Sequence, residues 1–173
     1  MTDHATTINA PEGTPFLDVT RDFDATPAQL FRALTEPGLV ARWLGPRDLE
    51  IDIEEYDART GGRYRYTHHG GHLGEARATF NGVFHTVEPD TLIVQTFEYE
   101  GVPGEVALEI HRFSVVDGRT RLTQRSVFPS LETREGALSS GMNFGIEQSM
   151  DRLAEVLAEL SAEAPAAAPA AAG

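Results

Sequence analysis

The chain has 173 residues, of which 40% are hydrophobic, and it carries a formal net charge of −13 at pH 7. A chain of this length can build one domain with a buried core. Because the negative charge repels phosphate groups and no basic stretch offsets it, we expect no binding to nucleic acid or to anionic membranes. No apolar run is long enough to cross a bilayer, and the absence of cysteine excludes disulfides and thiol chemistry.

The first residues predict an arm that precedes the folded domain. The opening stretch MTDHATTINAPEGTP lacks the basic region and the apolar run of a signal peptide, so we expect a cytoplasmic protein. Residues 1–14 are polar and patternless, which predicts a flexible arm. The domain is expected over residues 15–160. Residues 161–173, rich in Ala and Pro, should form a disordered tail because they offer no large apolar side chain to a core.

The domain should begin with a strand and two short helices. Residues Phe16–Phe23 alternate as a strand does. The stretch TPAQ at 26–29 then combines an N-cap threonine, a proline at the first helical position and a glutamine that can complete a capping box. A second short helix should carry Trp43 and end at the Gly-Pro pair 45–46.

The middle of the chain has the alternating pattern of β-strands. Turn signals rich in Gly, Pro and Asp separate six segments that alternate as strands. The expected strands are Leu49–Tyr56, Arg63–His68, Glu75–Val87, Thr91–Tyr99, Val106–Val115 and Arg121–Phe128. The connections are too short for parallel crossovers, so neighbouring strands should pair antiparallel. With the first strand this makes a sheet of about seven strands in an α+β fold.

One long amphipathic helix is predicted over Leu131–Leu160. Its apolar residues recur at helical spacing, and an acidic stripe occupies another face. The buried face carries Leu and Val in its second half. In its first half Gly141, Gly145 and Ser149 stand where larger side chains would be expected. These small residues allow either a close backbone approach or open volume beneath the helix.

The order of these elements resembles the SRPBCC superfamily, whose START-like domains have a helix-grip fold, and within it the branch named for activators of a heat-shock-protein ATPase. The pieces that carry the likeness are RDFDATPAQLFRALTEPGLVARWLGP, TGGRYRY, FNGVFHTVEPDTLIVQTFEYEG, DGRTRLTQRSVFPS and GMNFGIEQSMDRLAEVL. The resemblance implies a strongly curved antiparallel sheet around the C-terminal helix, with a cavity between them and the two short helices at one end. Members bind hydrophobic small molecules, and some relatives are aromatase/cyclases of polyketides.

Two departures from the family bear on function. The family commonly has Gly-Trp in the last helix, whereas this chain has Gly145-Ile146, which would enlarge or reshape the roof of the cavity. The heat-shock activators also carry a second, N-terminal domain, to which nothing in this sequence corresponds. The resemblance therefore does not imply a chaperone function.

The sequence contains no recognisable catalytic motif. It has no Gly-x-Ser-x-Gly elbow, no phosphate-binding loop and no dinucleotide fingerprint. His68, His69 and His72 are spaced closely enough to bind a transition metal. However, the glycines between these histidines make a mobile loop, so a solvated hairpin tip is the favoured interpretation. We expect no metal and no cofactor.

Histidines on the strands leave an acid–base role open. Both His85 and His111 could face the cavity as a general base, or could be ordinary surface or core histidines. Glu109 shares a strand face with His111 by the two-residue period. The pair could transfer protons, but charged pairs are more common on the solvent face of a sheet, and we assign no catalytic residue.

The candidate ligand-binding residues are aromatic side chains on alternating strand positions, polar residues on the same faces and the small-residue half of the last helix. Aromatic lining with a few polar groups is typical of a small-molecule cavity, although aromatic residues also fill ordinary cores. The predicted set is Trp43, Tyr64, Tyr66, Phe80, Phe84, Phe97, Tyr99, His111, Phe113, Gln124, Ser126, Phe128, Met142, Gly145, Ile146 and Ser149.

Three functions remain open at this point. The first is a protein that binds a hydrophobic or aromatic small molecule in the cavity, without catalysis. The second is a polyketide cyclase/dehydratase-like enzyme, which requires His85 or His111 to face inward beside a carboxylate or a tyrosine. The third is a co-chaperone-like interaction domain, which requires a contiguous apolar surface patch. The sequence leaves a homodimer open as an oligomeric state.

Overall fold

The computed structural model describes residues 5–163. It contains one eight-stranded antiparallel sheet with the strand order β1-β2-β8-β7-β6-β5-β4-β3. The strands are β1 (Thr7–Asn9), β2 (Phe16–Phe23), β3 (Glu50–Tyr56), β4 (Arg63–His69), β5 (Arg77–Glu88), β6 (Leu92–Tyr99), β7 (Ala107–Val116) and β8 (Arg119–Val127). The helices are α1 (Pro27–Thr35), α2 (Pro37–Trp43), α3 (Leu131–Ser139) and α4 (Met142–Glu163), with a single 3₁₀ turn, η1 (Gly71–Leu73). The α+β helix-grip fold expected from the sequence is confirmed.

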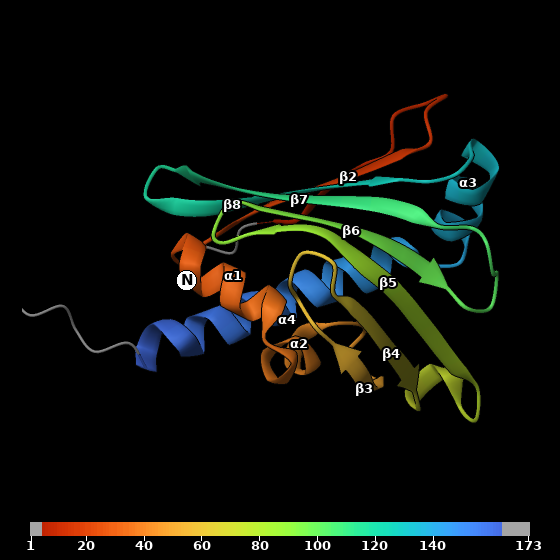
Figure 1. Cartoon of the computed structure of the whole chain (residues 1–173), viewed down its shortest axis with the longest axis horizontal. Coiled ribbons are helices and arrows are strands. Elements are labelled where there is room, and N and C mark those ends of the chain that lie inside the picture. The colour runs from red at the N-terminus through yellow and green to blue at the C-terminus, as the bar shows by residue number, and fades with distance from the viewer. Residues whose placement is uncertain (1–4, 164–173) are drawn as a thin grey trace, which may run out of the picture.

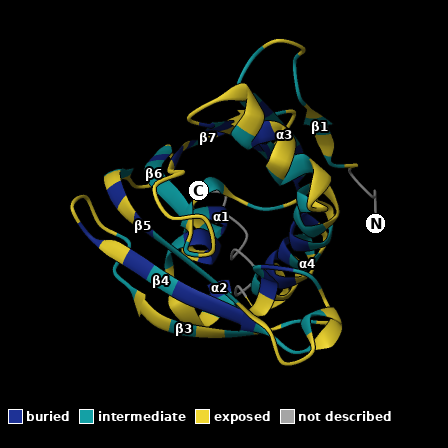
Figure 2. Cartoon of the chain, turned by 90° about the vertical axis from the view of Figure 1, so that its right-hand side faces the viewer, coloured by how far each residue is buried: buried dark blue, intermediate teal, exposed yellow. Residues whose placement is uncertain are grey.

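The sheet curls around α4, with α1 and α2 at one end and α3 at the other (Figure 1). Two register shifts contribute to the curvature, one in β3 between Ile53 and Glu55 and one in β5 between Phe84 and Thr86. A bulge of this kind bends its strand and increases the local twist. Viewed from the α3 end, the curved sheet and the two C-terminal helices form a ring, behind which α1 and α2 lie (Figure 2).

The start of α1 follows the predicted capping chemistry. The backbone N–H of Gln29 donates to Thr26 Oγ1 at 3.2 Å, and the Gln29 side chain accepts from the Thr26 N–H at 2.9 Å. Pro27 occupies the first turn, where its missing N–H costs no hydrogen bond. Local sequence is sufficient here because both halves of the capping box lie within one turn.

The N-terminal segment differs from the expected flexible arm. Thr7–Asn9 forms β1 and pairs with β2, with Ile8 opposite Val19. Ile8 also packs against the main core, which gives this short polar stretch an apolar attachment. The sheet therefore has eight strands rather than about seven. The tail expected from residue 161 onward falls mostly outside the described residues, and Ser161–Glu163 continue α4.

The predicted single helix over Leu131–Leu160 is wrong, because the structure divides it into α3 and α4. The break lies at Gly141, whose φ of 89° is the left-handed conformation that favours glycine. The Gly141 N–H donates to the carbonyl of Leu138, which ends α3. Gly141 therefore forms the corner between two helices and does not lie on a helix face with Gly145 and Ser149.

The second half of α4 provides the anchor to the sheet, as its Leu- and Val-rich pattern predicts. Leu153, Val156 and Leu157 are buried within the main core, and Leu153 is completely inaccessible to solvent. Burying apolar side chains of this size stabilises the fold by roughly 1.5–3 kcal/mol each. This packing holds the helix in place while its first half faces a cavity.

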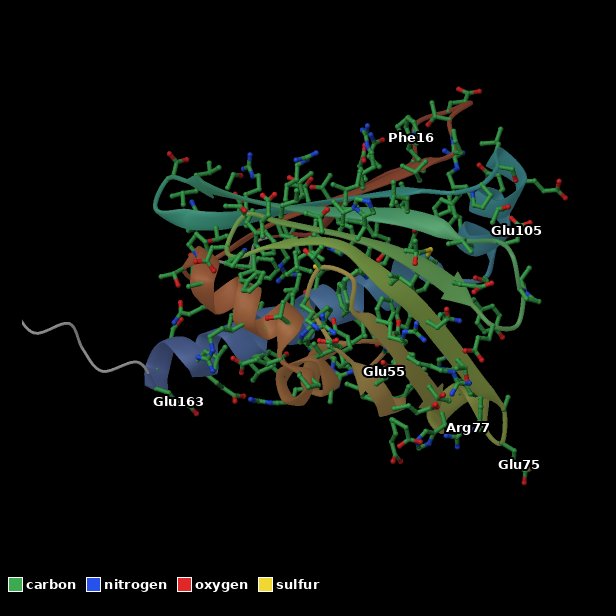
Figure 3. All side chains as sticks on the ribbon, in the orientation of Figure 1. Phe16, Glu55, Glu75, Arg77, Glu105 and Glu163 are labelled. Carbon is green, nitrogen blue, oxygen red and sulfur yellow. The ribbon has the colours of Figure 1, made fainter. Side chains whose placement is uncertain are left out.

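Three acidic side chains of the stripe on α4, those of Asp151, Glu155 and Glu159, pair with arginines. Arg21 on β2 is buried and binds Asp151 at 2.5 Å, and Arg47 binds Glu155 at 2.6 Å. Ion pairs between exposed side chains contribute little to stability. The pair made by the buried Arg21 therefore does more to fix α4 against β2 than the exposed pair of Arg47 does. Other acidic side chains, such as Glu55, Glu75 and Glu105, come from separate segments of the outer surface (Figure 3).

No helix among the described residues is both long enough and apolar enough to span a membrane.

Candidate functional site

A cavity of about 1420 Å³ lies between the sheet and the first half of α4. Its walls come from the inward faces of β4 to β8, from α3 and α4, and from the segment that follows α2. This is the space inside the ring of elements seen in Figure 2. Its volume exceeds that of most pockets that bind drug-sized ligands, which measure about 300–1,000 Å³.

One wall of the cavity is a continuous row of aromatic rings on β4, β5 and β6. The ring centroids of Tyr64 and Tyr66 lie 6.0 Å apart, and those of Tyr66 and Phe80 lie 5.3 Å apart. Phe80 in turn lies 5.2 Å from both Phe97 and Tyr99. All five residues line the cavity. The row arises because strand residues two apart share a face, so that three neighbouring strands present their rings side by side.

The opposite wall is the first half of α4. Met142, Ile146 and Met150 face the cavity at helical spacing. Gly145 leaves room beside them, because a Cβ atom built there meets only Pro46 Cγ, at 3.8 Å. Ser149 is buried and makes two hydrogen bonds: its Oγ accepts from the Gly45 N–H at 2.9 Å and donates to the Gly145 carbonyl at 2.7 Å. Gly145 thus adds open volume, whereas Ser149 joins α4 to the segment after α2.

The inner end of the cavity is polar and centres on the carboxylate of Glu109. Gln95 Nε2 donates to it at 3.0 Å, Gln124 Nε2 at 3.2 Å and the Ser126 hydroxyl at 3.3 Å. Strand register explains the cluster, because Glu109 on β7 lies opposite Gln95 on β6 and Ser126 on β8. The carboxylate is buried, with 6% of its residue surface exposed, and neutral donors alone surround it.

His111 lies beside Glu109 on the same face of β7. Its Nε2 is 3.6 Å from the nearer Glu109 oxygen, which is longer than a hydrogen bond. The side chain is buried and lines the cavity, yet neither of its ring nitrogens has a hydrogen-bond partner. A buried imidazole without partners is uncommon, because leaving such a group unpaired costs roughly 1–3 kcal/mol.

Burial and the Glu109 charge together raise the pKa of Tyr64 and of Tyr66 well above the ordinary value for tyrosine. Both phenols therefore stay protonated and can donate hydrogen bonds. The Tyr64 hydroxyl donates to the carbonyl of Thr96 at 2.7 Å and accepts from Gln95 at 3.4 Å. Gln95 thus connects the aromatic wall to the Glu109 cluster.

The cavity opens at the end near α3. Tyr99, Val102 and Phe144 line it there and are 40%, 51% and 59% exposed. They come from β6, the β6–β7 connection and the first turn of α4, so three separate segments meet at the mouth. Exposed apolar side chains in such a cluster are typical of an entrance for an apolar molecule.

The structure gathers most of the predicted site residues around this cavity, including Trp43, Phe128 and His111. Phe84, Phe113 and Ser126 lie outside it. Phe84 and Phe113 belong to the main core, and Ser126 is buried behind Glu109, to which it donates. The two-residue period of a strand predicts which residues lie on the inner face of the sheet. It does not predict whether such a residue is covered by other side chains or borders open space.

Sequence reasoning missed Glu109 and Gln95 as site residues. The sequence predicts His111 as a ligand-binding residue but leaves the face of the Glu109–His111 pair open, because charged pairs are more common on the solvent face of a sheet. The structure places both side chains inside. The direction of β7 is ambiguous in the sequence because both of its faces carry polar and apolar side chains. Leu108 and Ile110 alternate with the inward residues and lie on the outer face. The signal that pointed inward was Phe113, which shares the face of Glu109 and His111. His85 is exposed on β5.

The three clustered histidines separate from one another. His68 is buried against the rings of Tyr66 and Phe80, at 5.2 and 5.9 Å. His69 pairs with Asp52 at 3.2 Å, and the exposed His72 pairs with Asp48 at 2.7 Å. Within residues 5–163 no group of three or more ligating side chains could hold a metal ion.

Burial of His68 predicts a specific pH dependence of stability. Desolvation lowers its pKa, and the nearby charge of Arg152 acts in the same direction. Below the unfolded value of about 6.5, the unfolded chain binds the proton more readily than the folded one, so the free energy of unfolding falls as the pH decreases. The loss ends at the lower, folded pKa.

Urea unfolding between neutral pH and pH about 5 measures this slope, which cannot exceed about 1.4 kcal/mol per pH unit for one group. His68→Gln should flatten it, and His85→Gln, at an exposed position, should not. The same slope in wild type and in His68→Gln would contradict the prediction.

Comparisons with known proteins agree with this architecture. The model of the family described as activator of Hsp90 ATPase homolog 1-like protein matches residues 24–158. A crystal structure of a Rhodobacter sphaeroides protein is 27% identical, with a TM-score of 0.79, and the match covers 89% of this chain and 99% of that one. Protein Ms6760 from Mycobacterium smegmatis is 21% identical, with a TM-score of 0.80 and coverage of 88% and 96%.

A more distant likeness is to DynU16, a protein in the dynemicin biosynthetic locus, which is 21% identical with a TM-score of 0.61. The match covers 83% of this chain and 47% of DynU16, and at this identity it shows the fold alone. The search of the curated proteins finds no match. Since the family model covers most of the sequence and solved structures share the fold, the chain belongs to the activator of Hsp90 ATPase homolog 1-like family, which is of the SRPBCC type.

Proposed function

We propose that this protein binds an apolar or aromatic small molecule in the cavity between the sheet and α4, without catalysing a reaction. The observation that carries the proposal is the row of rings from Tyr64 to Tyr99 along one wall. A planar ligand lying against these rings would bury its faces and gain offset-stacking contacts. The apolar face of α4 would cover its other side, and the polar inner end would orient it.

Fluorescence titration with pyrene tests the proposal, since the four fused rings match the flat aromatic wall. We expect a dissociation constant in the micromolar range, which corresponds to about 8 kcal/mol. Phe80→Leu, in the middle of the wall, should weaken binding about tenfold because it removes ring contacts on both sides. The matched control is Phe113→Leu, which changes a buried phenylalanine outside the cavity. It should lower stability and leave pyrene affinity unchanged.

Two results would contradict the proposal. The first is that pyrene and other aromatic or aliphatic compounds fail to shift the thermal midpoint of the folded protein. The second is that Phe113→Leu weakens pyrene binding as much as Phe80→Leu does, which would place the bound molecule elsewhere.

A second candidate function is a polyketide cyclase/dehydratase-like enzyme. The observation that favours it is the inward-facing His111 beside the Glu109 carboxylate, which is the arrangement that this function requires. His111 would take an α-proton from a substrate carbonyl, and the resulting enolate carbon would attack a second carbonyl. The alkoxide formed would take that proton back from His111, and the aldol product would then lose its hydroxyl and a second α-proton as water. Incubation with an enolisable aromatic diketone, followed by mass spectrometry, tests this. A product that forms equally fast with His111→Leu, or no product, would exclude the role.

The co-chaperone-like function has no comparable support. It requires a contiguous apolar surface, and among the exposed large hydrophobic residues Tyr99, Val102 and Phe144 instead form the mouth of the cavity.

A further inference from the structure

The inner end of the cavity holds an imidazole whose hydrogen-bonding capacity is unused. His111 is 8% exposed, and both Nδ1 and Nε2 are buried without a partner. Its cross-strand neighbours do not supply one, since Ile93 is apolar and the Gln124 amide donates to Glu109 and Ser126. Buried polar groups normally find partners. His111 lines the cavity although its two ring nitrogens are enclosed, so a bound molecule that turns the ring slightly can supply the missing partner.

The neighbouring carboxylate decides which polar groups are acceptable. Glu109 is buried and faces the same end of the cavity, where its partners are two amides and one hydroxyl, none of which is charged. Among the described residues that line the cavity, the arginine is Arg47, which binds Glu155 outside. An anionic group placed at the inner end would therefore meet an unneutralised negative charge in a region of low dielectric, where repulsion is strong.

A neutral hydroxyl fits both residues. It can donate to an imidazole nitrogen and can accept from the imidazole N–H, so either tautomer of His111 is satisfied. The Glu109 carboxylate lies 3.6 Å from Nε2 of His111. It favours an orientation of the imidazole in which a ring N–H points toward the carboxylate. The Gln95 amide donates to the Tyr64 hydroxyl at 3.4 Å and to Glu109 at 3.0 Å, so the Tyr64 end of the aromatic wall adjoins the Glu109 cluster.

We propose that Glu109 and His111 form a subsite that selects aromatic ligands carrying a neutral hydroxyl, such as phenols, and rejects ligands carrying a carboxylate at that end. The inference rests on the proposed binding function and specifies its ligand class. His111 makes the contact with the hydroxyl, and Glu109 orients the imidazole and repels anions.

Three probes with the same ring system test the subsite: hydroxypyrene, methylpyrene and pyrenecarboxylate, titrated by fluorescence near neutral pH. Hydroxypyrene should bind about tenfold more tightly than methylpyrene, because the methyl group leaves the imidazole unpaired. Pyrenecarboxylate should bind at least about tenfold more weakly than methylpyrene, because of the Glu109 charge.

Variants assign these preferences to the two residues. His111→Leu should make hydroxypyrene and methylpyrene equal in affinity, and His111→Gln, which keeps a donor and an acceptor, should retain part of the preference. Glu109→Gln should restore about tenfold of the affinity for pyrenecarboxylate. His85→Leu, on the exposed face of β5, is the control and should change none of the ratios. Thermal unfolding of each variant reports whether it is folded.

The possible results distinguish a failure of the subsite proposal from a failure of the cavity as a binding site. If all three pyrenes bind equally well to the folded wild type, the subsite is wrong while the cavity remains a binding site. If hydroxypyrene keeps its full advantage in folded His111→Leu, His111 is not the selecting residue and the inference is overturned. If no pyrene binds, the proposed function fails, and the subsite fails with it.

Discussion

Replacing Ile146 with tryptophan should reduce the affinity for pyrene at least about tenfold while changing the free energy of unfolding by less than about 1.5 kcal/mol. Ile146 is half-buried on the cavity side of α4, opposite the wall of aromatic rings. A larger aromatic side chain at this position occupies the space that the ligand would fill. The fold should tolerate it, because the added atoms enter open volume rather than the packed core around Leu153.

The comparison with Ile146→Val isolates the effect of filling. Valine keeps the branched shape but removes one methylene, so it should leave pyrene affinity within about twofold and cost about 0.5–1.5 kcal/mol of stability. Affinity is measured by fluorescence titration and stability by urea unfolding of the same preparations. A folded Ile146→Trp variant that binds pyrene as tightly as wild type would show that the ligand does not lie beneath α4.

The largest loss of stability should come from Gly82→Ala, at about 3 kcal/mol. Gly82 on β5 lies opposite Tyr64 on β4, and the Tyr64 ring crosses over it to donate to the carbonyl of Thr96 on β6. A Cβ at residue 82 would lie 2.0 Å from that carbonyl oxygen and 2.6 Å from the Tyr64 ring. Neither neighbour can yield without breaking the pairing of β5 with β6 or removing Tyr64 from the aromatic wall.

Gly38→Ala is the matched control for this substitution. Gly38 lies in α2, and a Cβ built there meets no atom within 4 Å. Alanine at an unobstructed helical position should be neutral or stabilise by up to about 1 kcal/mol. Urea midpoints with an unchanged m value give both numbers. A loss of less than about 1 kcal/mol for Gly82→Ala would contradict the close approach of Tyr64 described above.

Local patterns predicted much of the fold. The strand β2 begins and ends at the predicted residues, and the other predicted strands match β3 to β8 within two residues at each end. The capping box of α1 also formed as its spacing indicates. These features depend on residues that are neighbours in sequence, so periodicity and turn chemistry suffice to find them. β1 was not predicted because Thr7–Asn9 is too short to show an alternating pattern, and the packing of Ile8 against the core is not visible in the local sequence.

The candidate site was less predictable, and the aromatic residues show why. Tyr66 and Phe84 both occupy inward strand positions, but Tyr66 faces the cavity whereas Phe84 is enclosed by core side chains. The difference depends on what lies across the sheet at each point. Likewise, Glu109 becomes part of the site because three strands in one register surround it with donors. A single strand read alone does not contain that information.

What the sequence determined by itself is the order and type of the elements, the family likeness and the set of aromatic side chains on alternating positions, since all of these depend on local spacing. What the tertiary structure decided is the break at Gly141, the inward direction of Glu109 and His111, and the separation of cavity from core. The physical reason is that a glycine ends a helix, and a polar pair such as Glu109 and His111 turns inward, only where the surrounding packing and hydrogen bonds make that arrangement the more stable one. The cavity beneath α4 exists because the second half of that helix is anchored in the core while its first half, from Met142 to Met150, faces a wall of rings across open space.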